Sequence, residues 1–135
     1  MNAQSTAFLQ QYRVVGAYQG VETADPHTLI GMLYDGLAES FANAKGAILR
    51  GDLAAKGGAV GRAIDILEGL RTSLDADRGG DVAANLSRLY TYMQERLTEF
   101  NLRNDPSALD ELLALNETLR DAWASIPLEA RRVGA

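Results

Sequence analysis

The stretch EFNLRNDPSALDEL, residues 99–112, contains the signals that decide the fold. Asn104 tolerates a left-handed backbone and is suited to end a helix, whereas Asp105 is suited to cap the next one. Pro106 fits the first turn of that next helix, where no backbone N–H is needed. One helix therefore ends and another begins almost immediately. A connection this short makes the second helix run back along the first.

The same kind of signal occurs elsewhere in the chain. Asp25 followed by Pro26 marks a helix start, and Gly51 followed by Asp52 marks a helix end and a new start. The segment DADRGGD, residues 75–81, provides a further turn, since its paired glycines allow the chain to reverse. Between these signals, apolar residues recur at steps of three and four, which is typical of helices with one buried face. We therefore predict four helices, at about 26–50, 53–75, 81–103 and 106–125.

The expected architecture is all-α, an antiparallel up-down four-helix bundle over residues 25–126. The bundle should bury the apolar arc of each helix, including Leu53 and Val82. Residues 1–24 are expected to form a separate cap with a short N-terminal helix that is too short to be stable alone, and that serves either as a mobile lid or as a permanent brace. Residues 127–135 are expected to form a flexible C-terminal tail.

The composition excludes several classes of protein. A chain of 135 residues, 47% of them hydrophobic, can bury one core. The absence of cysteine rules out a disulfide scaffold and a thiolate metal site, and with no export signal the expected location is the cytoplasm. The net charge of −5 argues against nucleic acid as a partner. No apolar run approaches the ~18 residues of a membrane span, so no membrane insertion is expected.

Residues suited to catalysis are scarce. His27, the one histidine, lies near the start of the first helix, where we expect it to be exposed and to have no acid–base role. The acidic residues are scattered, and there is no Glu-x-x-His motif of the kind that builds a di-iron site. Gly57, Gly58 and Gly61 lie within a helix and not between a strand and a helix, so they cannot form a phosphate-binding loop. We therefore predict no enzyme activity, no cofactor and no bound metal.

Two features of the predicted helices allow more than one interpretation. Four glycines lie on the arc of the second helix opposite its leucines: Gly57, Gly58, Gly61 and Gly69. Each costs about 1 kcal/mol relative to alanine, and they are either tolerated on a solvated face or mark a surface where another backbone approaches closely. Asn116 falls within the apolar arc of the last helix. Either a buried partner makes it fix the helix register, or the core opens there to solvent or ligand.

The stretch RLYTYMQERL, residues 88–97, has large side chains on two sides of its helix. Helical geometry places Met93 and Leu97 on the core face, with Tyr90 at one border. Tyr92 falls about 60° beyond the opposite border, so it is expected to be partly exposed. It either packs at the boundary with the next helix or offers contact area to a partner.

Other apolar residues also fall outside the predicted core. Met32 and Ile66 lie off the main apolar arcs of their helices, and Phe8, Tyr12 and Val15 give the N-terminal segment one apolar edge. Together with Tyr92 they indicate more apolar surface than a single four-helix core uses. The residues alone therefore predict a helical bundle that binds another chain.

Five motifs, taken in order, resemble the flagellin-specific export chaperone family, FliS. They are DPHTLIGMLYDGL at 25–37, GDLAAKG…AIDILEGL…LD at 51–75, GGDVAANLSRLYTYMQERL at 79–97, NLRND at 101–105 and DAW at 121–123. The similarity covers about residues 8–126. No single motif is specific, but their combination is.

The resemblance implies a cytoplasmic, non-enzymatic chaperone of the flagellar type III export system. Such a protein binds the disordered C-terminal segment of flagellin in a 1:1 complex, prevents premature polymerisation and supports delivery to the export gate. A homodimer of the free protein is an open option, and a helical adaptor or regulator of another flagellar or type III secretion protein is the alternative function. In the family, an N-terminal tyrosine that Tyr12 matches can cover the client surface. The expected flagellin-binding residues are Tyr12, Phe8, Met32, Ile66, Tyr90, Tyr92, Met93 and Leu97.

Overall fold

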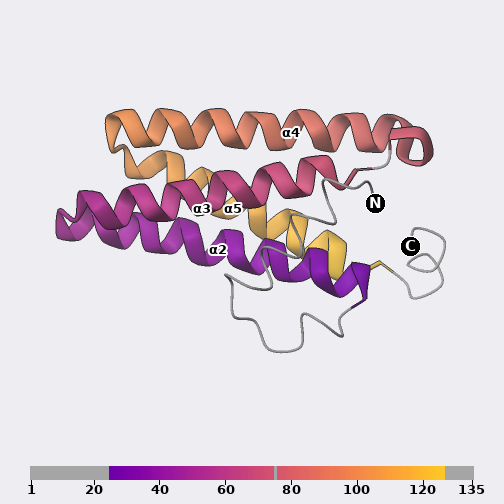
Figure 1. Ribbon diagram of the computed structural model, residues 1–135, viewed down its shortest axis with the longest axis horizontal. Coiled ribbons are helices and arrows are strands. Elements are labelled where there is room, and N and C mark those ends of the chain that lie inside the picture. Colours follow the sequence, from indigo (N-terminus) through magenta and orange to yellow (C-terminus); the bar gives the residue numbers. More distant parts are fainter. Residues whose placement is uncertain (1–24, 75, 127–135) are drawn as a thin grey trace.

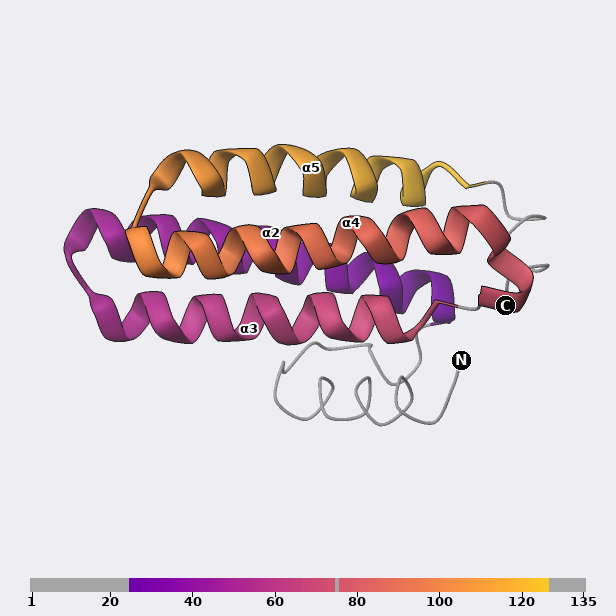
Figure 2. The same ribbon diagram turned by 90° about the horizontal axis from the view of Figure 1, so that it is seen from above.

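The computed structural model describes residues 25–74 and 76–126 of the chain. This part forms four helices: α2 (Pro26–Arg50), α3 (Leu53–Thr72), α4 (Ala76–Arg103) and α5 (Pro106–Ala124). They lie side by side in one elongated bundle, each running opposite to the helix before it (Figures 1 and 2). The prediction of an all-α bundle of four antiparallel helices is confirmed. The predicted cap at 1–24 and tail at 127–135 lie outside the described residues.

The predicted helix ends are formed by the residues that signalled them. The carboxylates of Asp25, Asp52 and Asp105 each accept a hydrogen bond from a backbone N–H of the following helix. Gly51 ends α2 in the left-handed conformation, with φ of 71°, and Asn104 follows α4 with φ of 57°. These caps satisfy backbone groups that a helix end leaves without partners, and they fix where each short connection begins.

The connection between α3 and α4 differs from the prediction. α3 ends at Thr72 and not at 75, and a short helical turn begins at Ala76. Gly80 then leaves the helical conformation, with φ of 53° and ψ of −127°, so the straight part of α4 begins at Asp81, as predicted. A Cβ atom at the neighbouring Gly79 would lie 2.6 Å from Cβ of Ala83. Both glycines are therefore needed for this tight entry into α4.

The core lies between the four helices and consists of long aliphatic and aromatic side chains. Full burial of such a side chain contributes about 1.5–3 kcal/mol. Tyr34, on the side of α2 that faces the interior, belongs to this core although its helix pattern did not reveal it. The largest fully buried side chains are Leu33, Leu37, Phe41, Ile66, Leu67, Leu70, Tyr90, Met93, Leu97, Phe100, Leu109 and Leu112.

Three apolar residues have the opposite exposure from that predicted. Ile66, expected at the surface, is 1% exposed. Its side of α3 faces α2, where the small residues Gly36 and Ser40 are buried and allow the two helices to approach closely. Leu53 and Val82, expected in the core, are 64% and 66% exposed. Leu53 is the first residue of α3, at the end of the bundle, and Val82 is exposed because of the path of α5.

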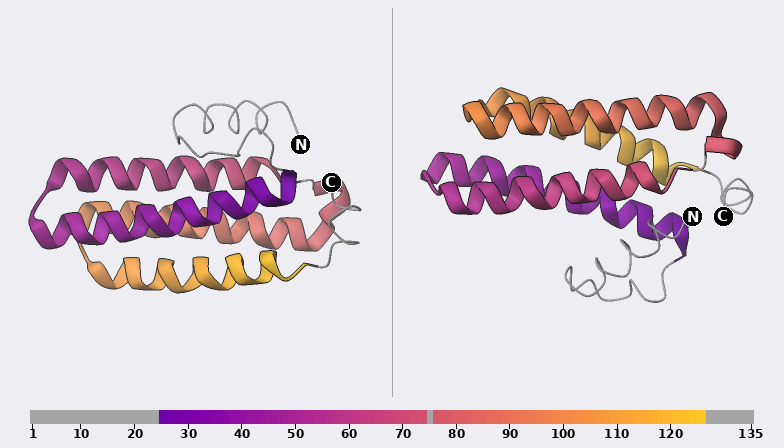
Figure 3. Two further views of the ribbon diagram at one scale, coloured as in Figure 1. Left: turned by 90° about the horizontal axis from the view of Figure 1, so that it is seen from below. Right: turned by 45° about the horizontal axis from the view of Figure 1, so that its top comes forward.

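α5 does not stay beside α4 along its whole length. It packs much more extensively against α2 than against α4. Figure 1 and the right-hand view of Figure 3 show α5 beginning next to the end of α4 and diverging from it towards the start of α2. The N-terminal half of α4 is therefore incompletely covered on the side that faces α5.

Candidate partner-binding face

The surface along the seam where α4 and α5 diverge is apolar. Helical spacing directs two leucines of each helix towards this seam, and all four are partly buried: Leu86 and Leu89 of α4, and Leu115 and Leu119 of α5. Val82, 66% exposed, and Tyr92, 40% exposed, extend the apolar surface along α4. We call this surface the α4–α5 face, and it comprises Val82, Leu86, Leu89, Tyr92, Leu115 and Leu119.

The exposure of Val82 and Tyr92 sets α4 apart in the described part of the chain. The other large hydrophobic side chains that are exposed there, Leu49, Leu53 and Leu102, lie at or near helix ends where the chain turns. Tyr92 instead lies in the middle of α4, and Val82, near the start of its straight part, continues a row of partly buried leucines that leads to Tyr92. Adjoining exposed and partly buried apolar side chains are typical of a surface that binds another chain.

A polar network closes the seam at one end of the α4–α5 face. The hydroxyl of Tyr92 donates to Oε1 of Glu111 at 2.6 Å, and Nε of Arg96 donates to the same oxygen at 3.1 Å. Arg96 also donates to Glu99 at 2.9 Å. The hydrogen bond raises the pKa of Tyr92 and lowers the pKa of Glu111. Tyr92 is therefore the proton donor and Glu111 the charged acceptor, which fixes the tyrosine ring at the edge of the face.

A buried polar layer lies inside the bundle and joins three helices. The hydroxyls of Tyr34 and Tyr90 are 2.6 Å apart, and burial raises the pKa of both. Nδ2 of Asn116 donates to the backbone carbonyl of Tyr34 at 2.9 Å. Asn116 is 1% exposed. The interpretation that it has a buried partner is therefore confirmed, and the interpretation that the core opens to solvent or ligand at this position is wrong.

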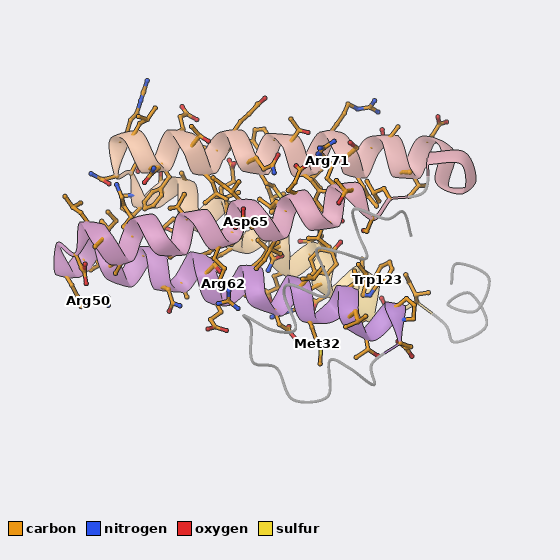
Figure 4. All side chains as sticks on the ribbon, viewed as in Figure 1. Met32, Arg50, Arg62, Asp65, Arg71 and Trp123 are labelled. Carbon is orange, nitrogen blue, oxygen red and sulfur yellow. The ribbon has the colours of Figure 1, made fainter. Side chains whose placement is uncertain are left out.

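His27 and Trp123 join the start of α2 to the end of α5. Their rings stack with centroids 4.7 Å apart and an angle of 10° between their planes. Nε1 of Trp123 donates to the carbonyl of His27 at 2.8 Å, and Nε2 of His27 donates to the carbonyl of Trp123 at 2.8 Å. Figure 4 shows Trp123 beside the first turns of α2. The prediction that His27 is exposed is therefore wrong, because Trp123 partly covers it.

The structure does not bring the predicted flagellin-binding residues together on one surface. Met93 and Leu97 are fully buried, and Tyr90 is buried with its hydroxyl bonded to Tyr34. Ile66 is also in the core, so a partner would reach any of these four only if the helices separated.

Of the remaining predicted residues, Tyr92 alone is both described and exposed. Met32 is partly buried and projects from the side of α2 that faces away from α4 (Figure 4). Phe8 and Tyr12 lie outside the described residues. Helical periodicity did not single out Leu86, Leu89 or Leu115 as surface residues, because it does not reveal where two helices diverge.

The glycine arc of α3 is open in part. Gly57, Gly58 and Gly61 are exposed, and a Cβ added at any of them meets nothing within 4 Å. Gly69, predicted to share this arc, is instead buried. Both interpretations of the first three glycines, tolerance on a solvated face or close approach of a partner, remain compatible with this arrangement.

Groups of metal-ligating side chains and membrane-spanning helices are both absent from the described part of the chain. Across residues 25–74 and 76–126, no three His, Cys, Asp or Glu side chains are placed to hold a metal ion. In the same ranges, no helix has the length and hydropathy needed to cross a membrane.

Comparison with known proteins gives consistent matches over most of the chain. A family model described as "Flagellar protein FliS" matches residues 8–130. Flagellar secretion chaperone FliSB of Pseudomonas aeruginosa is 45% identical over 118 residues, which cover 87% of this chain and 94% of that protein. Flagellar secretion chaperone FliS of Salmonella typhimurium is 41% identical over 123 residues, covering 90% and 91%. The Vibrio cholerae protein of the same name is 35% identical over 127 residues, covering 94% and 93%.

Proposed function

Since this chain belongs to the FliS family, we propose that it is a flagellar secretion chaperone whose client is flagellin. It holds the C-terminal segment of flagellin, which keeps the client from polymerising too early and allows its delivery to the export gate. The family consists of chaperones and not enzymes. A cytoplasmic location and a 1:1 complex complete the proposal.

The α4–α5 face is the proposed site for the client. A flagellin segment would lie along it as an amphipathic helix, with its apolar side on the leucines of both helices. The observation that supports this choice is the exposure of Val82 and Tyr92 beside partly buried leucines, where α5 leaves α4. Because the client orders as it binds, about 2–5 kcal/mol of the interaction free energy is consumed, which keeps the complex reversible.

Size-exclusion chromatography with two forms of flagellin tests the proposed function. The purified protein is mixed with full-length flagellin and, separately, with flagellin that lacks its C-terminal segment. We expect a 1:1 complex with the full-length protein and separate elution with the truncated one. Co-elution that is unaffected by the truncation would contradict the proposal and favour an adaptor that binds another region or another protein.

A further inference from the structure

The start of α5 makes polar contacts with both α2 and α4, whereas its C-terminal half makes them with α2. Near its start, α5 is held on both sides: Asp110 pairs with Lys45 of α2 at 2.7 Å, and Glu111 accepts from Tyr92 of α4 at 2.6 Å. Between residues 116 and 123, the polar contacts described between α5 and its neighbours all go to α2. They form three tethers, Asn116 to Tyr34, Arg120 to Asp35 and Trp123 to His27.

The spacing of these tethers directs one side of α5 towards α2. Residues 116, 120 and 123 are separated by steps of four and three, which place them on one stripe of a helix. The first tether is a buried hydrogen bond, the second is an exposed ion pair at 3.5 Å, and the third combines a ring stack with two hydrogen bonds. Since exposed ion pairs contribute little, Trp123 and Asn116 hold the helix most strongly.

A position of α5 beside α4 would cover apolar surface that is exposed in this structure. Val82 is 66% exposed, and Leu86 and Leu89 are only partly buried. If the C-terminal half of α5 lay against α4, it would cover these side chains and also Leu119. The tethers to α2 therefore hold α5 away from a position in which it would cover this apolar surface.

We infer that the three tethers are positioning elements, which hold the C-terminal half of α5 against α2 and so keep the α4–α5 face uncovered for its client. The inference rests on the proposed function for the identity of the client. The geometry of the tethers themselves does not depend on it.

Distance measurements in the free protein test the position of α5. The chain has no cysteine, so spin labels can be attached at Ala84→Cys and Ala122→Cys, two exposed alanines on α4 and α5. In Trp123→Ala, we expect the distance between the labels to shorten by about 5 Å or more, roughly the radius of a helix with its side chains. A second pair at Glu95→Cys and Ala114→Cys, near the closed end of the seam, should keep its distance.

Two further variants make the test robust. Asn116→Leu removes one tether without leaving a buried amide, so it should fold even if Trp123→Ala does not, and it should shorten the same distance. Lys45→Ala is the matched control, because it breaks a contact between α2 and α5 beside the closed end of the seam. It should leave both distances unchanged. An unchanged or longer distance in the folded tether variants would overturn the inference.

Binding measurements connect the position of α5 to the client. Without spin labels, the tether variants should bind the flagellin C-terminal segment about tenfold more weakly, whereas Lys45→Ala should bind within about twofold of the parent. A shortened distance with unchanged affinity would overturn the inference but leave the proposed function intact. If the parent itself bound no flagellin, the proposed function would fail, while the distances would still decide whether the tethers position α5.

Discussion

The hydroxyl of Tyr92 on α4 donates a 2.6 Å hydrogen bond to Oε1 of Glu111 on α5. Tyr92 is 40% exposed, so its ring presents an aromatic surface in an orientation that the hydrogen bond fixes. A contact residue that is already ordered loses little entropy when a partner binds. Tyrosines in such positions commonly contribute strongly to binding.

Substitution of Tyr92 separates the contribution of its ring from that of its hydroxyl. Tyr92→Ala should weaken binding of the flagellin C-terminal segment by about tenfold, because an exposed, pre-ordered aromatic contact is lost. Tyr92→Phe keeps the ring and should lose less. Isothermal titration calorimetry measures both affinities, with circular dichroism to confirm the fold. If Tyr92→Ala folds normally and binds as well as the parent, Tyr92 does not belong to the client surface.

The pH dependence of stability should depend on Glu111. The hydrogen bond from Tyr92, followed by that from Arg96, holds the pKa of Glu111 below its usual value of 4.5. Because the folded-state pKa is the lower one, the carboxylate contributes stability above pH 4.5, and this contribution is lost as the pH falls through the folded-state pKa. Urea unfolding should therefore show Glu111→Gln to be less stable than the parent at pH 7, with a smaller difference at pH 3. If the variant and the parent differed in stability by the same amount at pH 7 and pH 3, the lowered pKa of Glu111 would be contradicted.

The helices and their ends could be predicted from the sequence because their determinants are local. Asp25, Asp52 and Asp105 cap helices through hydrogen bonds to the chain that directly follows, and Gly51 and Asn104 adopt the left-handed conformation expected of them. Such signals act within a few residues of each other. They do not depend on how the helices pack.

The α4–α5 face could not be predicted in the same way because it depends on the path of α5. The periodicity of α4 placed Val82 in the core, and it would be buried if α5 ran beside α4 throughout. The contact between Trp123 and His27 joins residues at opposite ends of the described chain, and no local pattern reveals it. Ile66 shows the reverse case, since α2 covers a side of α3 that appeared to be free.

Lys56 should stabilise the end of α4. It is 7% exposed, and its Nζ donates to the carbonyl of Asn101 at 2.9 Å and to Oδ1 of Asn104 at 2.7 Å. A lysine at this position also interacts favourably with the negative end of the helix dipole. Lys56→Met leaves both acceptors without their donor and should lower the free energy of unfolding by about 1–3 kcal/mol in chemical denaturation. Lys45→Met, which breaks an exposed ion pair, is the control and should cost less than about 1 kcal/mol.

The exposed glycines of α3 can be tested by adding a methyl group. A Cβ at Gly58 meets nothing within 4 Å, so Gly58→Ala should raise the free energy of unfolding by about 0.5–1 kcal/mol. As a contrasting control at the entry into α4, Gly79→Ala should destabilise the protein, because its Cβ would lie 2.6 Å from that of Ala83. Thermal unfolding gives both values. If Gly58→Ala is more stable but binds flagellin more weakly, a partner approaches this face; unchanged binding indicates a solvated face.

Site-specific photo-cross-linking tests the central claim most directly. A benzophenone amino acid is incorporated at position 92 on the α4–α5 face, and in separate proteins at position 32 and at Asp65, an exposed residue of α3. Each protein is irradiated with full-length flagellin, and the cross-linked peptides are identified by mass spectrometry. We predict a cross-link from position 92 to the C-terminal segment of flagellin and none from Asp65. Cross-links to that segment from position 32 or Asp65, with none from position 92, would contradict the account.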